Sequence, residues 1–116
     1  MRFTISQQEQ FMNNLTLLYR APWDFDLYLK DDSFIMTVVF SEYNNFSQME
    51  VFRSFSIQKE TLIQHDKLGN LAELAKEIRE TYDNNIWTEI KPHVFISGKG
   101  TVAKYNDPMM PLGSIL

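Results

Sequence analysis

The chain contains no cysteine, and it has only four glycines and four prolines among its 116 residues. The absence of cysteine excludes disulfide bonds, thiolate metal ligands and cysteine nucleophiles. Few glycines and prolines, together with 44% hydrophobic and 14% aromatic residues, are typical of a folding globular chain and not of a disordered one. At this length we expect residues 1–116 to form one domain around a single hydrophobic core.

Long hydrophobic runs are also missing. No stretch approaches the roughly 18 to 20 apolar residues that a membrane-spanning helix needs. The first residues, MRFTISQQEQ, lack the apolar centre of an export signal. We therefore expect a soluble chain, and the lack of cysteine favours the cytoplasm.

Clusters of basic residues are absent too. The net charge of −4 lies in residues 1–50, which hold seven acidic and three basic residues, while residues 51–116 hold equal numbers of each. Proteins that bind nucleic acids usually carry a basic patch that displaces counterions from phosphates. The lysines and arginines of this chain are scattered singly, so direct nucleic-acid binding is disfavoured.

Two segments have the pattern of amphipathic helices. Ser6 and Glu9 have the spacing of a capping box, and the apolar residues that follow recur at helical intervals: Phe11, Leu15 and Leu18. This predicts a helix over about 7–19, ended by Pro22. Asn70 and Glu73 repeat the capping spacing before a second apolar stripe, which predicts a helix over about 70–83. The sequence leaves open whether residues 84–92 are helix or strand.

Between these helices the apolar residues alternate, as they do in half-buried strands. Trp23, Phe25, Leu27 and Leu29 fall on one face, and Asp24, Asp26, Tyr28 and Lys30 on the other. A two-residue loop at Asp31-Asp32 then forms a hairpin with the segment SFIMTVVFSEY. The core face pairs Leu29 with Phe34, Leu27 with Met36, Phe25 with Val38 and Trp23 with Phe40. The opposite face pairs Tyr28 with Ile35, Asp26 with Thr37 and Asp24 with Val39.

The remaining patterns complete the expected fold. Residues 50–60 predict a third strand, and residues 93–97 and 101–105 predict a hairpin around Gly98-Lys99-Gly100. The tail, residues 106–116, is expected to pack on the domain. The prediction is an α+β fold: an N-terminal helix, a three-stranded antiparallel meander, a second helix and a C-terminal β-hairpin, with the helices packed on one face of the sheet.

No motif predicts catalysis, a cofactor or a metal. The segment GKGT at 98–101 has the glycines of a phosphate-binding loop, but a hairpin turn explains it better because a strand follows. Asp24 and Asp26 have the spacing of a metal-binding carboxylate pair, but no nucleotide-binding pattern accompanies them. His65 beside Asp66, and His93, lack a recognisable nucleophile. We therefore expect a protein that is not an enzyme.

The remaining candidate is an acidic and aromatic interaction face made of Asp24, Asp26, Tyr28, Asp31, Asp32, Glu42 and Tyr43. Carboxylates steer a basic partner and tyrosine rings anchor it, although an ordinary solvated sheet face has the same composition. The leading hypothesis is an inhibitor of another protein, of the immunity-protein, antitoxin or phage-encoded type. The alternatives are a phage or mobile-element assembly protein that forms homo-oligomers, a homodimer included, through its sheet, and a small enzyme.

Overall fold

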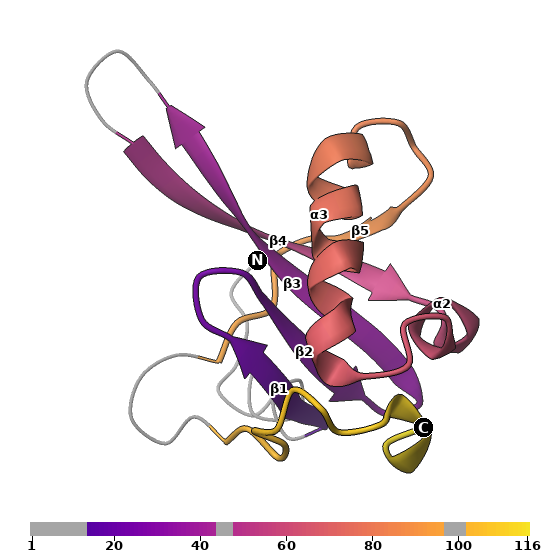
Figure 1. Cartoon of the computed structure of the whole chain (residues 1–116). Helices are drawn as coiled ribbons and strands as arrows, with labels where there is room; N and C mark the ends of the chain where they lie inside the picture. Colours follow the sequence, from indigo (N-terminus) through magenta and orange to yellow (C-terminus); the bar gives the residue numbers. More distant parts are fainter. Residues whose placement is uncertain (1–13, 44–47, 97–101) are drawn as a thin grey trace.

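A five-stranded antiparallel sheet forms the centre of the molecule (Figure 1). The computed structural model describes residues 14–43, 48–96 and 102–116. The strands lie in the order in which they occur in the chain: β1 (Leu15–Ala21), β2 (Phe25–Lys30), β3 (Ser33–Tyr43), β4 (Gln48–Ile57) and β5 (Thr88–Ile90). Each strand therefore pairs with its neighbour in sequence. The first three connections are short, whereas residues 58–87, which include the longest helix, join β4 to β5.

Helices are few and lie on one face of the sheet. The longest, α3 (Leu71–Thr81), crosses the front of the sheet as drawn in Figure 1. It confirms the second helix, which the sequence predicts over about 70–83. The other helical segments are single turns: α2 (Lys59–Ile63), η1 (Leu68–Asn70) and η2 (Leu112–Ser114). None of the helices within the described ranges is long and apolar enough to cross a membrane.

The β2–β3 hairpin has the register that the sequence predicts. Lys30 pairs with Ser33 around the two-residue turn, and the predicted pairs from Leu29–Phe34 to Phe25–Val38 all form. Asp31 has a φ of 52°, the left-handed conformation that such turns require and that aspartate tolerates better than most residues. The register of the hairpin depends only on the local alternation of apolar residues and on one turn. Both can be read from the sequence, so the register was predictable.

The predicted N-terminal helix is wrong where it can be compared, because Leu15–Ala21 is strand β1. Residues 7–13 of that prediction lie outside the described residues. A β-bulge between Leu17 and Tyr19 inserts Leu18, so neighbouring apolar residues point to both faces. Leu17 packs in the core on one face while Leu18 and Tyr19 pack in the core on the other. This spacing breaks the alternation of a strand and resembles that of a helix.

The predicted C-terminal hairpin is also absent from the described part of the chain. The fifth strand is instead Thr88–Ile90, which pairs with Ser54–Ser56 of β4. Residues 93–96 have no strand assignment, and residues 97–101, which hold the predicted turn, lie outside the described residues. The fold is therefore one sheet of five strands, not a three-stranded meander with a separate hairpin.

Both faces of the sheet are covered. The larger core lies beneath α3 and contains Phe25, Leu27, Met36, Val38 and Phe55. The smaller core lies on the opposite face, where Val94 covers Leu15, Leu17, Tyr28 and Ile35. β3 is the central strand of the five, and its apolar residues serve both cores: Met36 and Val38 belong to the larger one and Ile35 to the smaller one.

The C-terminal tail packs on the domain, as the sequence predicts. Leu112 is 1% exposed and joins the larger core. The backbone N–H groups of Leu68 and Gly69 donate to Met110 and Pro108, at 3.1 and 2.8 Å. The tail thus closes the end of the core next to α2, where Figure 1 places the C-terminus.

Candidate functional site

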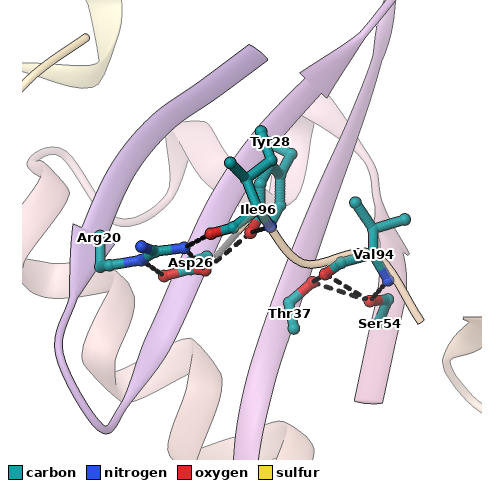
Figure 2. A network of polar contacts seen from close by, with 7 residues as sticks. All are labelled: Arg20, Asp26, Tyr28, Thr37, Ser54, Val94 and Ile96. Carbon is teal, nitrogen blue, oxygen red and sulfur yellow. Dashed lines mark hydrogen bonds and ion pairs between the residues drawn. The ribbon is translucent and has the colours of Figure 1, made fainter. Parts of the chain in front are cut away.

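A row of polar side chains crosses the sheet on the face opposite α3. Arg20 of β1 lies opposite Asp26 of β2, which lies opposite Thr37 of β3, which lies opposite Ser54 of β4. Directly opposed residues share a face, so the pairing places all four side chains in one line (Figure 2). Asp26, Thr37 and Ser54 are 5%, 1% and 0% exposed.

Residues 94–96, called the strap below, lie over this row. Side chains of the row form hydrogen bonds with the backbone N–H and carbonyl groups of the strap. The N–H of Val94 donates to the Ser54 hydroxyl at 2.7 Å, and the Thr37 hydroxyl donates to the Val94 carbonyl. Because the Thr37 proton is used there, the Ser54 hydroxyl donates to Thr37 Oγ1 at 2.7 Å. The result is a closed ring of hydrogen bonds between Val94, Ser54 and Thr37. A buried backbone that lacks a strand partner needs such side-chain bonds.

Arg20, Asp26 and Tyr28 hold the other end of the strap. Arg20 Nε and Nη2 donate to the two carboxylate oxygens of Asp26, each at 2.8 Å, and Nη2 also donates to the Ile96 carbonyl. The Tyr28 hydroxyl donates to Asp26 at 2.8 Å and accepts from the Ile96 N–H at 2.9 Å. Burial raises the pKa of Tyr28 well above its ordinary value, so this hydroxyl keeps its proton and acts as a donor.

Asp24 and Asp26, which the sequence places on one face, diverge. Asp24 precedes β2 and accepts a hydrogen bond at 2.6 Å from Arg79, which belongs to α3 on the other face of the sheet. Arg79 also donates to the backbone carbonyls of Asp24 and Val39, each at 2.7 Å. The two carboxylates therefore do not converge on a shared cation.

The predicted interaction face does not form one surface. Asp26 and Tyr28 are 5% and 0% exposed and bond within the chain, so their side chains do not reach the surface that the alternation predicts. Asp31 and Asp32 are exposed at the β2–β3 turn, the opposite end of β2 from Asp24. Glu42 and Tyr43 belong to the end of β3, where they pair with Met49 and Gln48. Their side chains lie outside the described part of the structure.

Trp23, predicted to pack in the core, is 78% exposed. It occupies the third position of a β-turn that the Asp24 N–H closes on the Ala21 carbonyl at 3.0 Å. Pro22 supplies the second position, and Trp23 has a φ of 65°, a conformation in which glycine is usual and bulky residues are rare. The left-handed turn lies before β2 and interrupts the predicted alternation, so Trp23 is exposed and does not join the core that contains Phe40. Neither core packing nor backbone preference explains a tryptophan here.

A recess of about 230 Å³ lies beside Trp23, on the strap side of the sheet. Its lining is mainly apolar and includes Pro22, Trp23, Val39, Phe52 and Phe95, with Arg20, Asp26 and Thr37 contributing polar atoms. The Phe52 and Phe95 rings stack with centroids 4.6 Å apart. The Arg20 guanidinium lies over Phe95, 4.9 Å from its ring centre. The salt bridge between Arg20 and Asp26 and the stacked phenylalanine rings thus form one continuous wall of the recess.

Sequence reasoning missed Arg20, Ser54, Phe52 and Phe95 as parts of this site. A signal for Arg20 exists, because it is the one charged residue of the apolar strand β1. Ser54 has no such signal, because Arg53 and Ser56 are also polar residues of β4. Polar residues of buried strands need partners, and the row supplies them. No comparable signal identifies Phe95, since its role depends on how residues 91–96 cross the sheet.

The histidines and acids show no metal or catalytic arrangement within the described ranges. Among those residues, no three histidine, aspartate or glutamate side chains lie close enough to hold a metal ion. His65 Nδ1 lies 2.8 Å from the Thr61 carbonyl of the preceding helical turn, and exposed His93 packs 6.0 Å from Phe52. Comparisons with protein-family models, curated proteins and solved structures found no match. Function is therefore inferred from the geometry of the recess and the buried row.

Proposed function

We propose that this chain is a non-enzymatic protein-binding module that inhibits another protein, with Trp23 and the recess beside it as the contact site. The observation that carries the proposal is the exposure of Trp23 in a left-handed turn. A backbone conformation of this kind costs about 1–3 kcal/mol and is kept mainly where function requires it. Exposed tryptophans beside apolar recesses are frequent anchors of protein–protein interfaces.

The support around Trp23 suits a binding anchor. Arg79 holds the turn by three hydrogen bonds to Asp24 and Val39. The Val39 N–H also donates to the Asp24 carbonyl at 2.9 Å. An anchor that is fixed before binding loses little conformational entropy when the partner arrives. The polar groups deeper in the row are occupied by internal bonds, which favours binding over catalysis as the role of this surface.

The alternative of a protein that assembles through its sheet has less support. That hypothesis uses a second copy to cover the apolar residues of β3 on the face opposite α3. In the structure, Val94 of the same chain packs against Ile35 there. The sheet face therefore has a cover within one chain.

Affinity capture from the native host tests the proposal. Immobilised wild-type chain should retain one protein in a saturable manner, and Trp23→Gly should weaken the measured affinity for that protein about 30-fold or more. Glycine accepts the turn conformation, so the stability of this variant should be unchanged or increased. A stoichiometric amount of the wild-type chain should inhibit the retained protein.

Ile86→Ala is the matched control, because Ile86 is also a large exposed apolar side chain, at 63%, but does not line the recess. This variant should bind as the wild type does. Equal capture by the wild type and Trp23→Gly, or the absence of any saturable capture, would contradict the proposed site.

A further inference from the structure

The size and walls of the recess indicate which part of a partner it takes. Its volume of about 230 Å³ is below the roughly 300–1,000 Å³ of sites for drug-sized ligands, so one or two side chains of a larger molecule fit it. A sugar ring would require spare side-chain acceptors. Both oxygens of Asp26 already accept hydrogen bonds, and Thr37 Oγ1 accepts one from Ser54.

Hydrogen-bond donors, in contrast, remain available at the recess. Arg20 uses Nε and Nη2 for Asp26 and Ile96, while its Nη1 bonds none of the described residues. Figure 2 shows this third guanidinium nitrogen without a dashed line. The indole N–H of Trp23 likewise has no partner in the described part of the chain, and its side chain is largely exposed. The occupant should therefore supply acceptors and few donors.

A proline-rich segment meets these requirements. Proline has no backbone N–H but keeps its carbonyl acceptor, and its ring packs well on aromatic faces. The polyproline II conformation is formed before binding, so little entropy is lost. The walls are also fixed in advance, because Phe52 and Phe95 stack at an interplanar angle of 25° and Arg20 covers Phe95.

The negative charge beside the recess indicates which residues should lie next to the prolines in the bound segment. Glu50, Phe52 and Ser54 alternate along β4 and so share the strap side of the sheet. Glu50 is exposed there, two residues from the Phe52 wall. The net charge of the whole chain is −4. A basic residue next to the prolines complements this charge.

We infer that the recess binds a proline-rich segment of the partner protein, in polyproline II conformation, with a lysine or arginine that pairs with Glu50. The proline rings pack against Trp23, Phe52 and Phe95, and proline carbonyls accept hydrogen bonds from Trp23 Nε1 and Arg20 Nη1. The inference rests on the proposed protein-binding function and adds the chemistry of the partner.

Titration of the ¹⁵N-labelled full-length chain with short capped peptides tests this inference. The probe peptide contains mainly proline and one arginine; in two control peptides, alanine replaces every proline or glutamate replaces the arginine. The probe should shift the NMR signals of the Trp23 indole and the Arg20 Nε–H, and the alanine peptide should bind at least about tenfold more weakly. Glu50→Lys should weaken binding of the peptide that contains arginine and strengthen binding of the peptide that contains glutamate.

Three outcomes would overturn the inference: equal binding of the proline and alanine peptides, binding of the probe that Trp23→Gly leaves unchanged, or no shift of the Trp23 indole at millimolar probe. If the probe peptide does not bind but capture of a host protein still depends on Trp23, only the inference of a proline-rich segment is refuted. Loss of the dependence on Trp23 in both experiments would refute the contact site itself.

Discussion

At the residue scale, Tyr28 joins the strap to the salt bridge between Arg20 and Asp26 through one buried hydroxyl. It is 0% exposed, donates to Asp26 and accepts from the Ile96 N–H. Replacing this hydroxyl by an apolar group would leave the Ile96 N–H without an acceptor and would take one of its donors from Asp26, which keeps those of Arg20. The strap and Asp26 therefore depend on the same atom.

Tyr28→Phe should destabilise the protein by about 1–3 kcal/mol, because it leaves the Ile96 N–H without its acceptor and removes one donor to Asp26. Urea unfolding followed by circular dichroism measures the change. Tyr82→Phe is the control, since the Tyr82 ring packs edge-on against Phe40 and its hydroxyl bonds none of the described residues. That control should cost less than about 0.5 kcal/mol. Equal losses in the two variants would contradict the proposed role of the Tyr28 hydroxyl.

Alkaline pH should destabilise the protein through Tyr28. Burial, with help from the Asp26 charge, raises the pKa of its hydroxyl in the folded state, although the hydrogen bond from Ile96 opposes the shift. An unfolded tyrosine has a pKa of about 10, so the unfolded state loses the proton first. The contribution of protonated Tyr28 to the free energy of unfolding is thus complete below about pH 10. It is lost as the pH rises towards the pKa of Tyr28 in the folded state.

Urea unfolding across this alkaline range measures the effect. The free energy of unfolding should fall more steeply for the wild type than for Tyr28→Phe. Burial also raises the pKa of Tyr19, so a smaller slope should remain in the variant. A variant slope as steep as that of the wild type would show that Tyr28 does not cause the loss.

At the scale of elements, α3 does more than cover the core. Its Arg79 donates to the backbone carbonyl of Val39 within β3, and to the backbone carbonyl and carboxylate of Asp24 just before β2. A planar guanidinium can make these bonds together because its donors diverge in fixed directions. The helix thereby fixes the turn that presents Trp23.

Arg79→Ala should destabilise the protein by about 1–2 kcal/mol, since charge-assisted hydrogen bonds are lost from a site that is about one-third exposed. The turn should also loosen, so the fluorescence anisotropy of Trp23 should fall. A Trp87→Phe background assigns the signal to Trp23, because these are the two tryptophans of the chain. Lys76→Ala removes the same charge from an exposed position of α3 and should change neither quantity. Matching results for the two variants would exclude a specific role of Arg79.

At the scale of the whole molecule, the acidic residues and the aromatic anchor are separated. Asp31 and Asp32 lie at the far end of β2 from Trp23, a distance of about 20 Å for a strand of six residues. That distance is more than twice the screening length of about 8 Å in physiological salt, so in the proposed binding the two acids would act on a partner before it docks and not within the recess. Under the proposal, charge and contact therefore serve different stages of binding.

The double variant Asp31→Lys with Asp32→Lys should slow association with the captured partner about tenfold at low salt and leave dissociation unchanged. The difference should shrink at high salt, because ions screen exposed charges. Trp23→Gly should instead speed dissociation. Surface plasmon resonance at two ionic strengths separates the rates. An effect of the aspartates on dissociation alone would place them inside the contact.

The sequence by itself determined the elements that depend on neighbouring residues. Alternation and a two-residue turn predicted the β2–β3 register, and an apolar stripe predicted α3. The predicted cap does not form, because the Asn70 side chain makes no capping hydrogen bond. The same reasoning failed at β1, because both of its faces are covered and a bulge removes the alternation. It also failed at Trp23, where a single left-handed residue reverses the expected face.

Only the tertiary structure decided which of the predicted carboxylates are available to a partner. Asp26 is buried because Arg20 lies opposite it and residues 94–96 cross above it, and Asp24 is occupied by an arginine 55 positions further along the chain. Such contacts join segments that are distant in sequence, and local periodicity carries no information about them. The sequence determined the hairpin and the excess of acid, whereas long-range packing buried one acid, paired another and left Trp23 exposed.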